Sequence, residues 1–245
     1  MYLDYQGRFY LRDLKNDLEP TLVNIEDSKI LILSKKRFSE AQGIVSQLRE
    51  DIIRHIEKEK IFKNSLISLE STSDEPYIIR IMKRYSQIMK VGPMACVAGA
   101  IAQILGERLF NGEDMIVENG GDIFIFKKGP IGIRVYTDDE IFKDRLLVNI
   151  DHCNDSVGIA TSSATIGPSL SFGRTSATIV ISNNCALSDA AATRIANEVR
   201  SSNDLERVLN KYKRIIYDFN VPITGVLCII DSNMAAFGKI KVSLE

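Results

Sequence analysis

The stretch VENGGDIFIF, residues 117–126, places Asn-Gly-Gly-Asp between two apolar runs. Asn-Gly is the strongest short-range signal for a two-residue β-turn, because both residues tolerate positive φ. The local pattern therefore predicts an antiparallel hairpin. The second glycine and the aspartate admit two explanations at this point. Either both belong to the turn, or the glycines allow the backbone to approach a ligand closely.

Segments on both sides of this hairpin have the composition of strands. Strands are predicted at 7–14, 29–33, 114–118, 122–126, 131–136, 145–150, 157–162, 176–182, 224–231 and 235–244. Helices are predicted at 39–62, 77–91, 92–110, 187–202 and 204–216. Because strands and helices each come in runs, the order favours an α+β fold with antiparallel sheets over a doubly wound α/β fold.

The predicted helices differ in how much of their surface should be buried. The helix over 39–62 carries one apolar stripe, with Ser39 as a candidate cap and His55 beside the stripe on a solvated face. The helix over 92–110 is apolar all round, so we expect it to be buried, with Pro93 in its first turn. The polar segment 70–76 predicts a loop between sub-structures.

Length and charge limit the class of protein. The chain has 245 residues, which fits one domain, 1–245, built as a compact unit of two lobes with a loop near 70–76. A formal net charge of −1 argues against a nucleic-acid partner bound through bulk charge. The longest apolar stretch, 91–106, is interrupted and short for a membrane span, and the first residues lack the apolar core of a secretory signal. We therefore expect a soluble, cytoplasmic protein with no membrane partner.

The cysteines and histidines form no recognisable metal motif. The four cysteines include no CxxC pair, and His55 and His152 have no zinc-ligand spacing. The segment Asp151-His152-Cys153 fits a polar loop better than a ligand cluster. We expect reduced thiols.

Four segments can carry chemistry, and each also has a plain structural interpretation. The helix start GPMACVAG can hold a phosphate on its free amides, or it can simply begin a core helix. The turn at 119–122 can lie against a ligand, or it can be a hairpin alone. Thr161, Ser162 and Ser163 end a strand, where three hydroxyls can bind a phosphate, a ribose or a base edge, or can form a Ser/Thr turn.

The fourth segment, ALSDAAATRIAN at 186–197, begins a helix that Ser188 or Asp189 can cap. Asp189 and Thr193 are four residues apart, which places them on one helix face with Cβ atoms roughly 5–6 Å apart. A carboxylate and a hydroxyl can form part of a Mg²⁺ shell. The plain alternative is a helix cap followed by a half-buried threonine.

The order of these segments resembles the ApbE-like superfamily, the FMN transferases once described as thiamine-biosynthesis lipoproteins. The matching elements are a Gly-led buried helix, the NGGDI turn, the GIATS strand end and the DAAAT helix start, between about residues 90 and 200. The motifs GPMA, ENGGDI, SLSFG and DAAAT are most similar to a short, uncharacterised cytoplasmic subgroup of that superfamily.

The resemblance implies a T-fold-like arrangement of antiparallel sheets and helices, with a pocket between two lobes. It implies a divalent metal, Mg²⁺, held by Asp189, Thr193 and the main-chain carbonyl of Ala95. It also implies a flavin nucleotide, FAD or FMN, in that pocket. The residues expected around it are Asn119, Gly120, Gly121, Asp122, Thr161, Ser162, Ser163 and Arg174.

The chain also departs from the flavin transferases at two places. Cys96 stands where that family has a lysine, and GPSLSFGRTSAT at 167–178 replaces a histidine-containing segment, with Arg174 as its one charged side chain. The missing histidine argues against transfer of FMN to a protein threonine. Alternatives are a metal-assisted enzyme acting on a nucleotide diphosphate, a non-catalytic carrier, and a component of sulfide assimilation into homocysteine.

Two points stay open at the level of sequence. Cys96 can be a packing residue, which its apolar helix favours, or a thiolate activated by a helix N-terminus. The sequence names no oligomeric state, and a homodimer is compatible with it.

Overall fold

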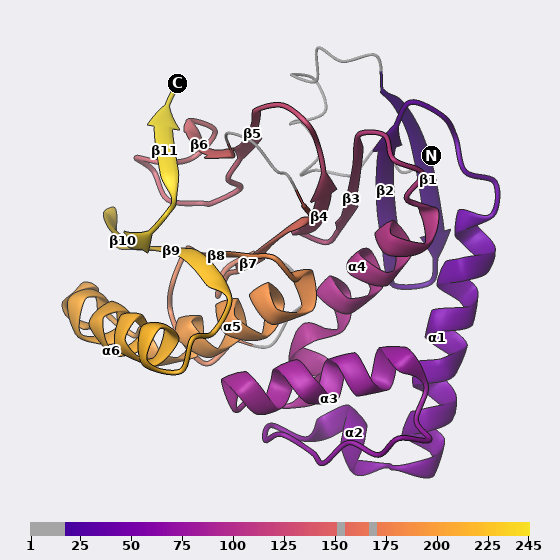
Figure 1. The fold of residues 1–245 in the computed structure, drawn as a ribbon. Helices are drawn as coiled ribbons and strands as arrows, with labels where there is room; N and C mark the ends of the chain where they lie inside the picture. The colour runs from indigo at the N-terminus through magenta and orange to yellow at the C-terminus, as the bar shows by residue number, and fades with distance from the viewer. Residues whose placement is uncertain (1–17, 151–154, 167–170) are drawn as a thin grey trace.

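The computed structural model describes residues 18–150, 155–166 and 171–245. The strand predicted at 7–14 and the segment Asp151-His152-Cys153 lie outside these residues. The described chain forms three layers, in which one large sheet separates the helices from a small sheet (Figure 1). This arrangement confirms the expected α+β fold with antiparallel sheets.

The large sheet has eight strands in the order β1-β2-β3-β4-β7-β8-β9-β10, and every neighbouring pair is antiparallel. The small sheet pairs its three strands in the order β11-β6-β5, also antiparallel. The strands are β1 (Glu19–Ile25), β2 (Ser28–Ser34), β3 (Met115–Asn119), β4 (Asp122–Phe126), β5 (Ile131–Arg134), β6 (Leu146–Ile150), β7 (Val157–Ser162), β8 (Ala177–Ser182), β9 (Ile223–Ile230), β10 (Asn233–Gly238) and β11 (Lys241–Leu244).

Two strand predictions need correction. Strand β1 was not predicted, because it is an edge strand whose Leu22 is 61% exposed and whose apolar signal is therefore weak. The strand predicted at 235–244 is two strands, because the chain turns at Gly238. Gly238 has φ +83°, and a Cβ there would lie 2.3 Å from the Thr224 carbonyl oxygen, so only glycine fits.

The central strands are buried on both faces. In β2, Ile30 and Ile32 pack into the core on the helix side, whereas Leu31 and Leu33 pack into the core against the small sheet. Successive side chains of a strand point to opposite faces, so a strand between two cores is apolar at every position. This explains the uninterrupted apolar runs of β2 and β8.

The helices cover one face of the large sheet (Figure 1). They are α1 (Ala41–Lys58), α2 (Ile61–Asn64), α3 (Tyr77–Met89), α4 (Val97–Leu109), α5 (Cys185–Glu198) and α6 (Leu205–Asp218), with short 3-10 turns at Pro93–Cys96 and Ser202–Asp204. The helix predicted at 39–62 is therefore two helices. The expected loop at 70–76 joins α2 to α3, while the division into two lobes stays a prediction.

Three predictions about helix starts also change. Ser39 does not cap α1, whose N-cap is Glu40 with no side-chain cap bond. Helix α5 begins at Cys185 and is capped by Asn184, whose side-chain oxygen accepts from the Leu187 amide at 2.9 Å. Asp189 therefore lies inside the helix and its carboxylate is free of a capping role.

Close packing of α4 against α5 positions the functional helix faces. A Cβ on Gly99 would lie 2.5 Å from the Cys185 carbonyl oxygen and 2.8 Å from Asp189 Cβ. A Cβ on Gly158 of β7 would lie 2.3 Å from the Cys185 amide nitrogen. Both glycines therefore hold the start of α5 close to α4 and to the sheet.

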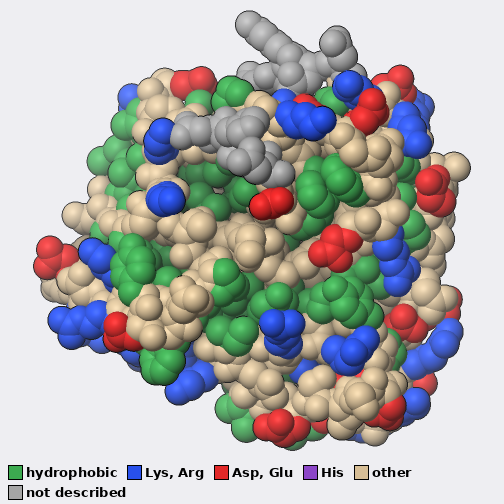
Figure 2. All heavy atoms as spheres, viewed as in Figure 1, with side chains coloured by type: hydrophobic (Ala, Val, Ile, Leu, Met, Phe, Trp, Pro, Cys, Tyr) green, Lys and Arg blue, Asp and Glu red, His purple; other side chains and the backbone are tan. Residues whose placement is uncertain are grey.

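Among the described residues, no single helix is long and apolar enough to cross a membrane, and one pair, Tyr77–Met89 with Pro93–Leu109, meets the criterion jointly but is bent by 101°. On the face seen in Figure 2, acidic and basic side chains are interspersed with apolar ones.

Candidate functional site

The hairpin turn at Asn119–Asp122 explains both of its glycines. Asn119 pairs with Asp122 across the β3–β4 register, so Gly120 and Gly121 form a two-residue turn. Their φ angles are +66° and +105°, which only glycine adopts at little cost. The Asn119 side-chain amide donates to the Ala98 carbonyl at 3.0 Å, which ties the turn to α4. Turn geometry alone accounts for the second glycine.

The aspartate after the turn has a different role, because its carboxyl meets that of Asp189. Asp122 is buried and Asp189 is half-buried, and the two side chains interact closely enough that each shifts the pKa of the other. The Gly99 amide donates to Asp189 Oδ2 at 2.9 Å, and the Ala98 amide also donates to this side chain. The Thr161 amide donates to Asp122. Strand β4, strand β7 and helices α4 and α5 thus converge on one acid pair.

A hydroxyl and a carbonyl oxygen complete a cluster of hard oxygen donors. Thr193 lies one helical turn after Asp189, and its Oγ1 donates to the Ala95 carbonyl at 3.4 Å. Carboxylates, hydroxyls and main-chain carbonyls are the ligands that Mg²⁺ takes in proteins. None of the ion pairs among the described residues involves either carboxyl. The donor set therefore fits a divalent cation.

Burial raises the pKa of both acids. Burial raises the pKa of Asp189 to about 7, against hydrogen bonds from Gly99, Asp122 and Ala98 that lower it. Burial also holds the pKa of Asp122 well above its usual value, and the neighbouring charge of Asp189 adds to this shift. The interaction between the two side chains raises the pKa of Asp122 and lowers that of Asp189, so Asp122 is the side chain that holds a proton more readily.

Two cavities meet at the acid pair, and they share the five residues Met94, Ala98, Asp122, Asp189 and Thr193. The first chamber, of about 620 Å³, lies toward the C-terminal end of α5 and is also lined by Lys63, Leu66, Lys90, Phe172, Arg194 and Arg200. The second chamber, of about 460 Å³, is also lined by Arg49, Ile52, Ile56, Val97, Asn119 and Gly120. Asp122, Asp189 and Thr193 therefore lie where the two chambers join, and the first chamber has more basic side chains in its lining than the second.

The structure brings most of the predicted site residues together. Thr161, Ser162 and Ser163 line the second chamber with Asn119 and Gly120. The Ser163 hydroxyl accepts from the Thr165 and Ile166 amides, each at 3.1 Å, so the Ser/Thr-turn interpretation is right for this residue.

Two predicted residues line neither chamber. Gly121 serves the turn, and Arg174 is exposed, with its amide donating to the Val199 carbonyl at 2.9 Å. The Arg174 side chain is thus not brought to the site, because the segment around it folds back on the end of α5.

Sequence reasoning missed the basic wall of the first chamber. Lys63, Lys90, Arg194 and Arg200 come from separate elements and form no motif. Only Arg194 carried a local signal, since it directly follows Thr193. Its guanidinium donates to the Tyr212 hydroxyl at 2.9 Å and pairs with Glu198 at 3.0 Å, which holds it on the rim.

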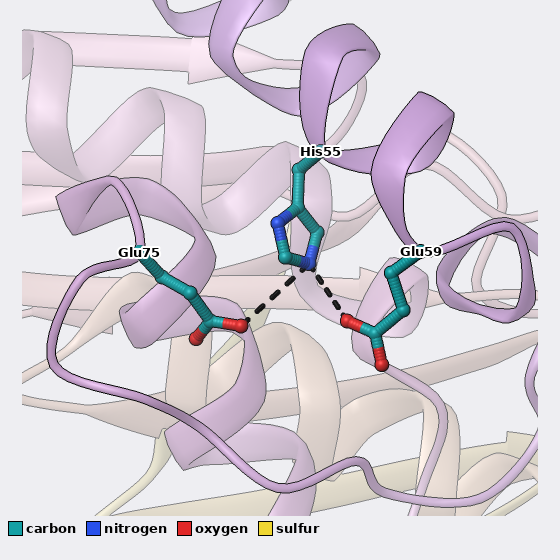
Figure 3. A group of neighbouring side chains, drawn as sticks. All are labelled: His55, Glu59 and Glu75. Atoms are coloured by element: carbon teal, nitrogen blue, oxygen red, sulfur yellow. Dashed lines mark hydrogen bonds and ion pairs between the residues drawn. The ribbon is translucent and has the colours of Figure 1, made fainter.

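A second cluster with metal-ligand chemistry lies apart from the chambers. Figure 3 shows His55 Nε2 between Glu59 and Glu75, at 2.9 and 3.7 Å. The expectation of a solvated His55 was wrong, because α1 packs that face toward the loop before α3. The Lys83 ammonium lies 2.7 Å from Glu59 and 2.5 Å from Glu75, and its side chain is 2% exposed. This ammonium already provides the positive charge that a metal would supply.

Cys96 is a packing residue. It has no solvent exposure, and its thiol donates to the Met82 and Pro93 carbonyls at 3.3 and 3.2 Å. Burial, together with the nearby carboxylates, raises the pKa of this thiol well above its usual value. The interpretation of Cys96 as an activated thiolate is not supported by this geometry.

Comparison with known protein families matches residues 12–213 to the family described as AbpE bacteria. The chain belongs to this family. Relatives of the AbpE chain include the UPF0280 protein of Methanocaldococcus jannaschii, 33% identical over 220 residues that cover 88% of this chain and 89% of the relative. The UPF0280 protein of Methanocella arvoryzae is 32% identical, with coverage of 80% and 78%.

Solved structures show the same fold at low sequence identity. The flavin transferase ApbE from Vibrio cholerae has a TM-score of 0.58 and 12% identity, with 90% of this chain and 97% of that chain covered. The apo flavinyl transferase ApbE from Pseudomonas stutzeri has a TM-score of 0.55 and 11% identity, with coverage of 90% and 94%. This AbpE-family chain therefore has the fold of the ApbE flavin transferases, as the sequence motifs indicated.

Proposed function

We propose that this protein binds a flavin nucleotide, FAD or FMN, or a related nucleotide diphosphate, together with a divalent metal, Mg²⁺, between the two chambers. The observation that carries the proposal is the meeting of Asp122, Asp189 and Thr193 with the Ala95 carbonyl at the junction of both cavities. The names of the structural neighbours, which are flavin transferases, support the choice of ligand class.

The metal would be held by the carboxylates of Asp189 and Asp122, the Thr193 hydroxyl and the Ala95 carbonyl. When bound, it would neutralise and polarise a diphosphate. Asp122 is an addition to the set expected from sequence, and its contact with Asp189 motivates it. The Asn119 bond to Ala98 and the amide bonds to Asp189 keep these donors in place without a ligand.

The two chambers suit an extended ligand with charged and apolar parts. In the first chamber, Lys63, Lys90 and Arg200 place positive charge beside the acid pair, which favours an anionic group. In the second chamber, Ile52, Ile56 and Val97 form an apolar wall opposite the Thr161–Ser163 strand end. A nucleotide diphosphate presents both kinds of surface on either side of its phosphates.

We infer ligand binding rather than transfer of FMN to a protein. The replacement of the histidine segment by residues 167–178 motivates this choice, and a non-catalytic carrier remains the alternative to a metal-assisted hydrolase. The role in sulfide assimilation finds no support in the buried thiol of Cys96.

The test is calorimetric titration of the purified protein with FAD, FMN and ADP, each with Mg²⁺ and with EDTA. We expect binding that depends on Mg²⁺, and its loss in Asp189→Asn and Thr193→Val. The matched control is Ser243→Ala, a substitution on the exposed strand β11, away from both chambers.

Chromatography of the same mixtures distinguishes the activities. Cleavage of FAD to FMN and AMP identifies a hydrolase, and FAD recovered intact identifies a carrier. The absence of Mg²⁺-dependent binding for all three nucleotides would refute the proposal.

A further inference from the structure

The SFG segment at 171–173 places an aromatic ring on the wall of the first chamber. Phe172 lines this chamber, and its side chain is 49% exposed. An aromatic side chain on the wall of a cavity is available to contact a ligand, because ligand pockets are lined largely by apolar and aromatic side chains. The segment has no role in the metal cluster, and it belongs to the stretch that replaces the histidine-containing segment of the flavin transferases.

Three contacts fix this segment on the C-terminal half of α5. The Phe172 amide donates to Asn197 Oδ1 at 2.8 Å. Gly173 packs so tightly that a Cβ would lie 1.8 Å from the Ala196 carbonyl oxygen. The Arg174 amide donates to the Val199 carbonyl at 2.9 Å. The backbone around Phe172 is therefore held in place by the same helix that carries Asp189 and Thr193.

The surroundings of Phe172 define the kind of group that it can contact. Leu66, 61% exposed, and Met94 also line this chamber and offer apolar surface. The rest of the lining is polar and charged, with Lys63 and Arg200 among the basic side chains and Glu198 among the acidic ones. A chamber lined by apolar surface, several cationic side chains and the acid pair suits a planar ring joined to phosphate better than it suits an aliphatic chain.

We propose that Phe172 is the ring-stacking residue of this site. The ring is the adenine or the isoalloxazine of a nucleotide whose phosphates lie at Asp189 and Thr193. This inference rests on the proposed function and deepens it. Stacking on an aromatic face tolerates several ring types, because every base has a π-face.

The fixed backbone around Phe172 should strengthen the contact between its ring and the ligand. A residue held by Asn197 and by the close approach of Gly173 loses little freedom when the ligand binds. Both features are local to this segment, so Gly173→Ala should displace Phe172 and reproduce part of the effect of its removal.

The experiment compares wild type, Phe172→Ala and Phe172→Tyr in calorimetric titrations with FMN, ADP and inorganic pyrophosphate, each with Mg²⁺. We expect Phe172→Ala to weaken binding of FMN, of ADP or of both by about tenfold or more. Phe172→Tyr should retain wild-type affinity, because it keeps the ring. Pyrophosphate, which has no ring, should bind both variants as it binds wild type.

The matched control is Phe219→Ala. Phe219 is another exposed aromatic residue, 77% exposed, and it lines a neighbouring groove beside α6 but not the first chamber. Thermal unfolding of each variant checks that the fold is retained. A selective loss for ADP assigns adenine to the first chamber, and a selective loss for FMN assigns the flavin ring.

Other outcomes overturn the inference. Equal affinity of Phe172→Ala and wild type for FMN and ADP refutes stacking and leaves the proposed function intact. Pyrophosphate bound as tightly as both nucleotides also refutes it, since the ring then contributes nothing. A wild-type protein that binds none of the three probes refutes the inference and the proposed function together.

Discussion

Replacing Asp189 by Asn should stabilise the metal-free protein and abolish its response to magnesium. Asn keeps the shape of the side chain, an oxygen that can accept from the Gly99 amide at 2.9 Å, and a donor for Asp122. It removes one of two carboxyls that interact closely. A substitution that improves stability and removes ligand binding is typical of functional rather than structural residues.

The magnitude follows from the pKa of Asp189, which burial raises from 3.8 to about 7. An acid whose folded pKa exceeds its unfolded pKa destabilises the fold once the unfolded state ionises. The penalty therefore grows between about pH 4 and pH 7 and is constant above. At 1.36 kcal/mol per unit, about three units correspond to ~4 kcal/mol. A proton held by Asp122 relieves part of this, so we expect a gain on the order of 1–4 kcal/mol at pH 8.

Thermal unfolding followed by circular dichroism measures both effects. In EDTA at pH 8, each kcal/mol that Asp189→Asn adds to the free energy of unfolding should raise the Tm of a chain of this size by about 2–4 °C. At pH 4 the difference between variant and wild type should vanish. Adding Mg²⁺ at 100 times its Kd should stabilise wild type by about 2.7 kcal/mol and leave the variant unchanged.

Two results would contradict this reasoning. If Asp189→Asn unfolds at a lower temperature than wild type in EDTA at pH 8, the carboxylate is structurally required. If the variant gains as much from Mg²⁺ as wild type does, Asp189 does not hold the metal. The control is Asp51→Asn on α1, a residue that lines neither chamber. Asn keeps the oxygen that accepts from Gln47 Nε2, so this change should alter neither the Tm nor the magnesium response.

Four further predictions concern packing and buried charge. Gly99→Ala should lower the free energy of unfolding by about 1–3 kcal/mol and weaken the magnesium response, because its Cβ would lie 2.8 Å from Asp189 Cβ. An unchanged melting curve would count against the close α4–α5 contact. Lys83→Met should lower the free energy of unfolding by about 3–5 kcal/mol, since Glu59 and Glu75 lose their ammonium partner. Burial raises the pKa of Glu75, but hydrogen bonds, first among them that from Lys83, lower it below 4.5 overall. The stability that Glu75 contributes is therefore present above pH 4.5 and is lost as the pH falls through its folded pKa. Chemical denaturation should show that the free energy of unfolding falls less on acidification in Glu75→Gln than in wild type. Cys96 should resist iodoacetamide in the native protein and react after unfolding, as mass spectrometry of the peptides can show; native labelling would contradict its burial.

Much of the fold is visible in the sequence because it follows from local periodicity. The strands β4 and β7 lie where alternation and turn residues predict them, and Gly120 and Gly121 have the positive φ that the Asn-Gly signal implies. The strand β1 was missed because an edge strand with one exposed face has a weak apolar signal. Helix α5 was found, but its cap was assigned four or five residues too late, at Ser188 or Asp189 instead of Asn184.

Some features of the candidate site could likewise be predicted from the sequence, and others could not. The sequence by itself determined that Asp189 and Thr193 share a helix face, since four residues make about one helical turn, and that a tight turn precedes Asp122. Only the tertiary structure decided that Asp122 and Asp189 lie close to each other, that His55 is enclosed with Lys83, and that Arg174 turns away. Local geometry depends on neighbours in the chain, whereas burial and charge pairing depend on which distant elements the two cores bring into contact.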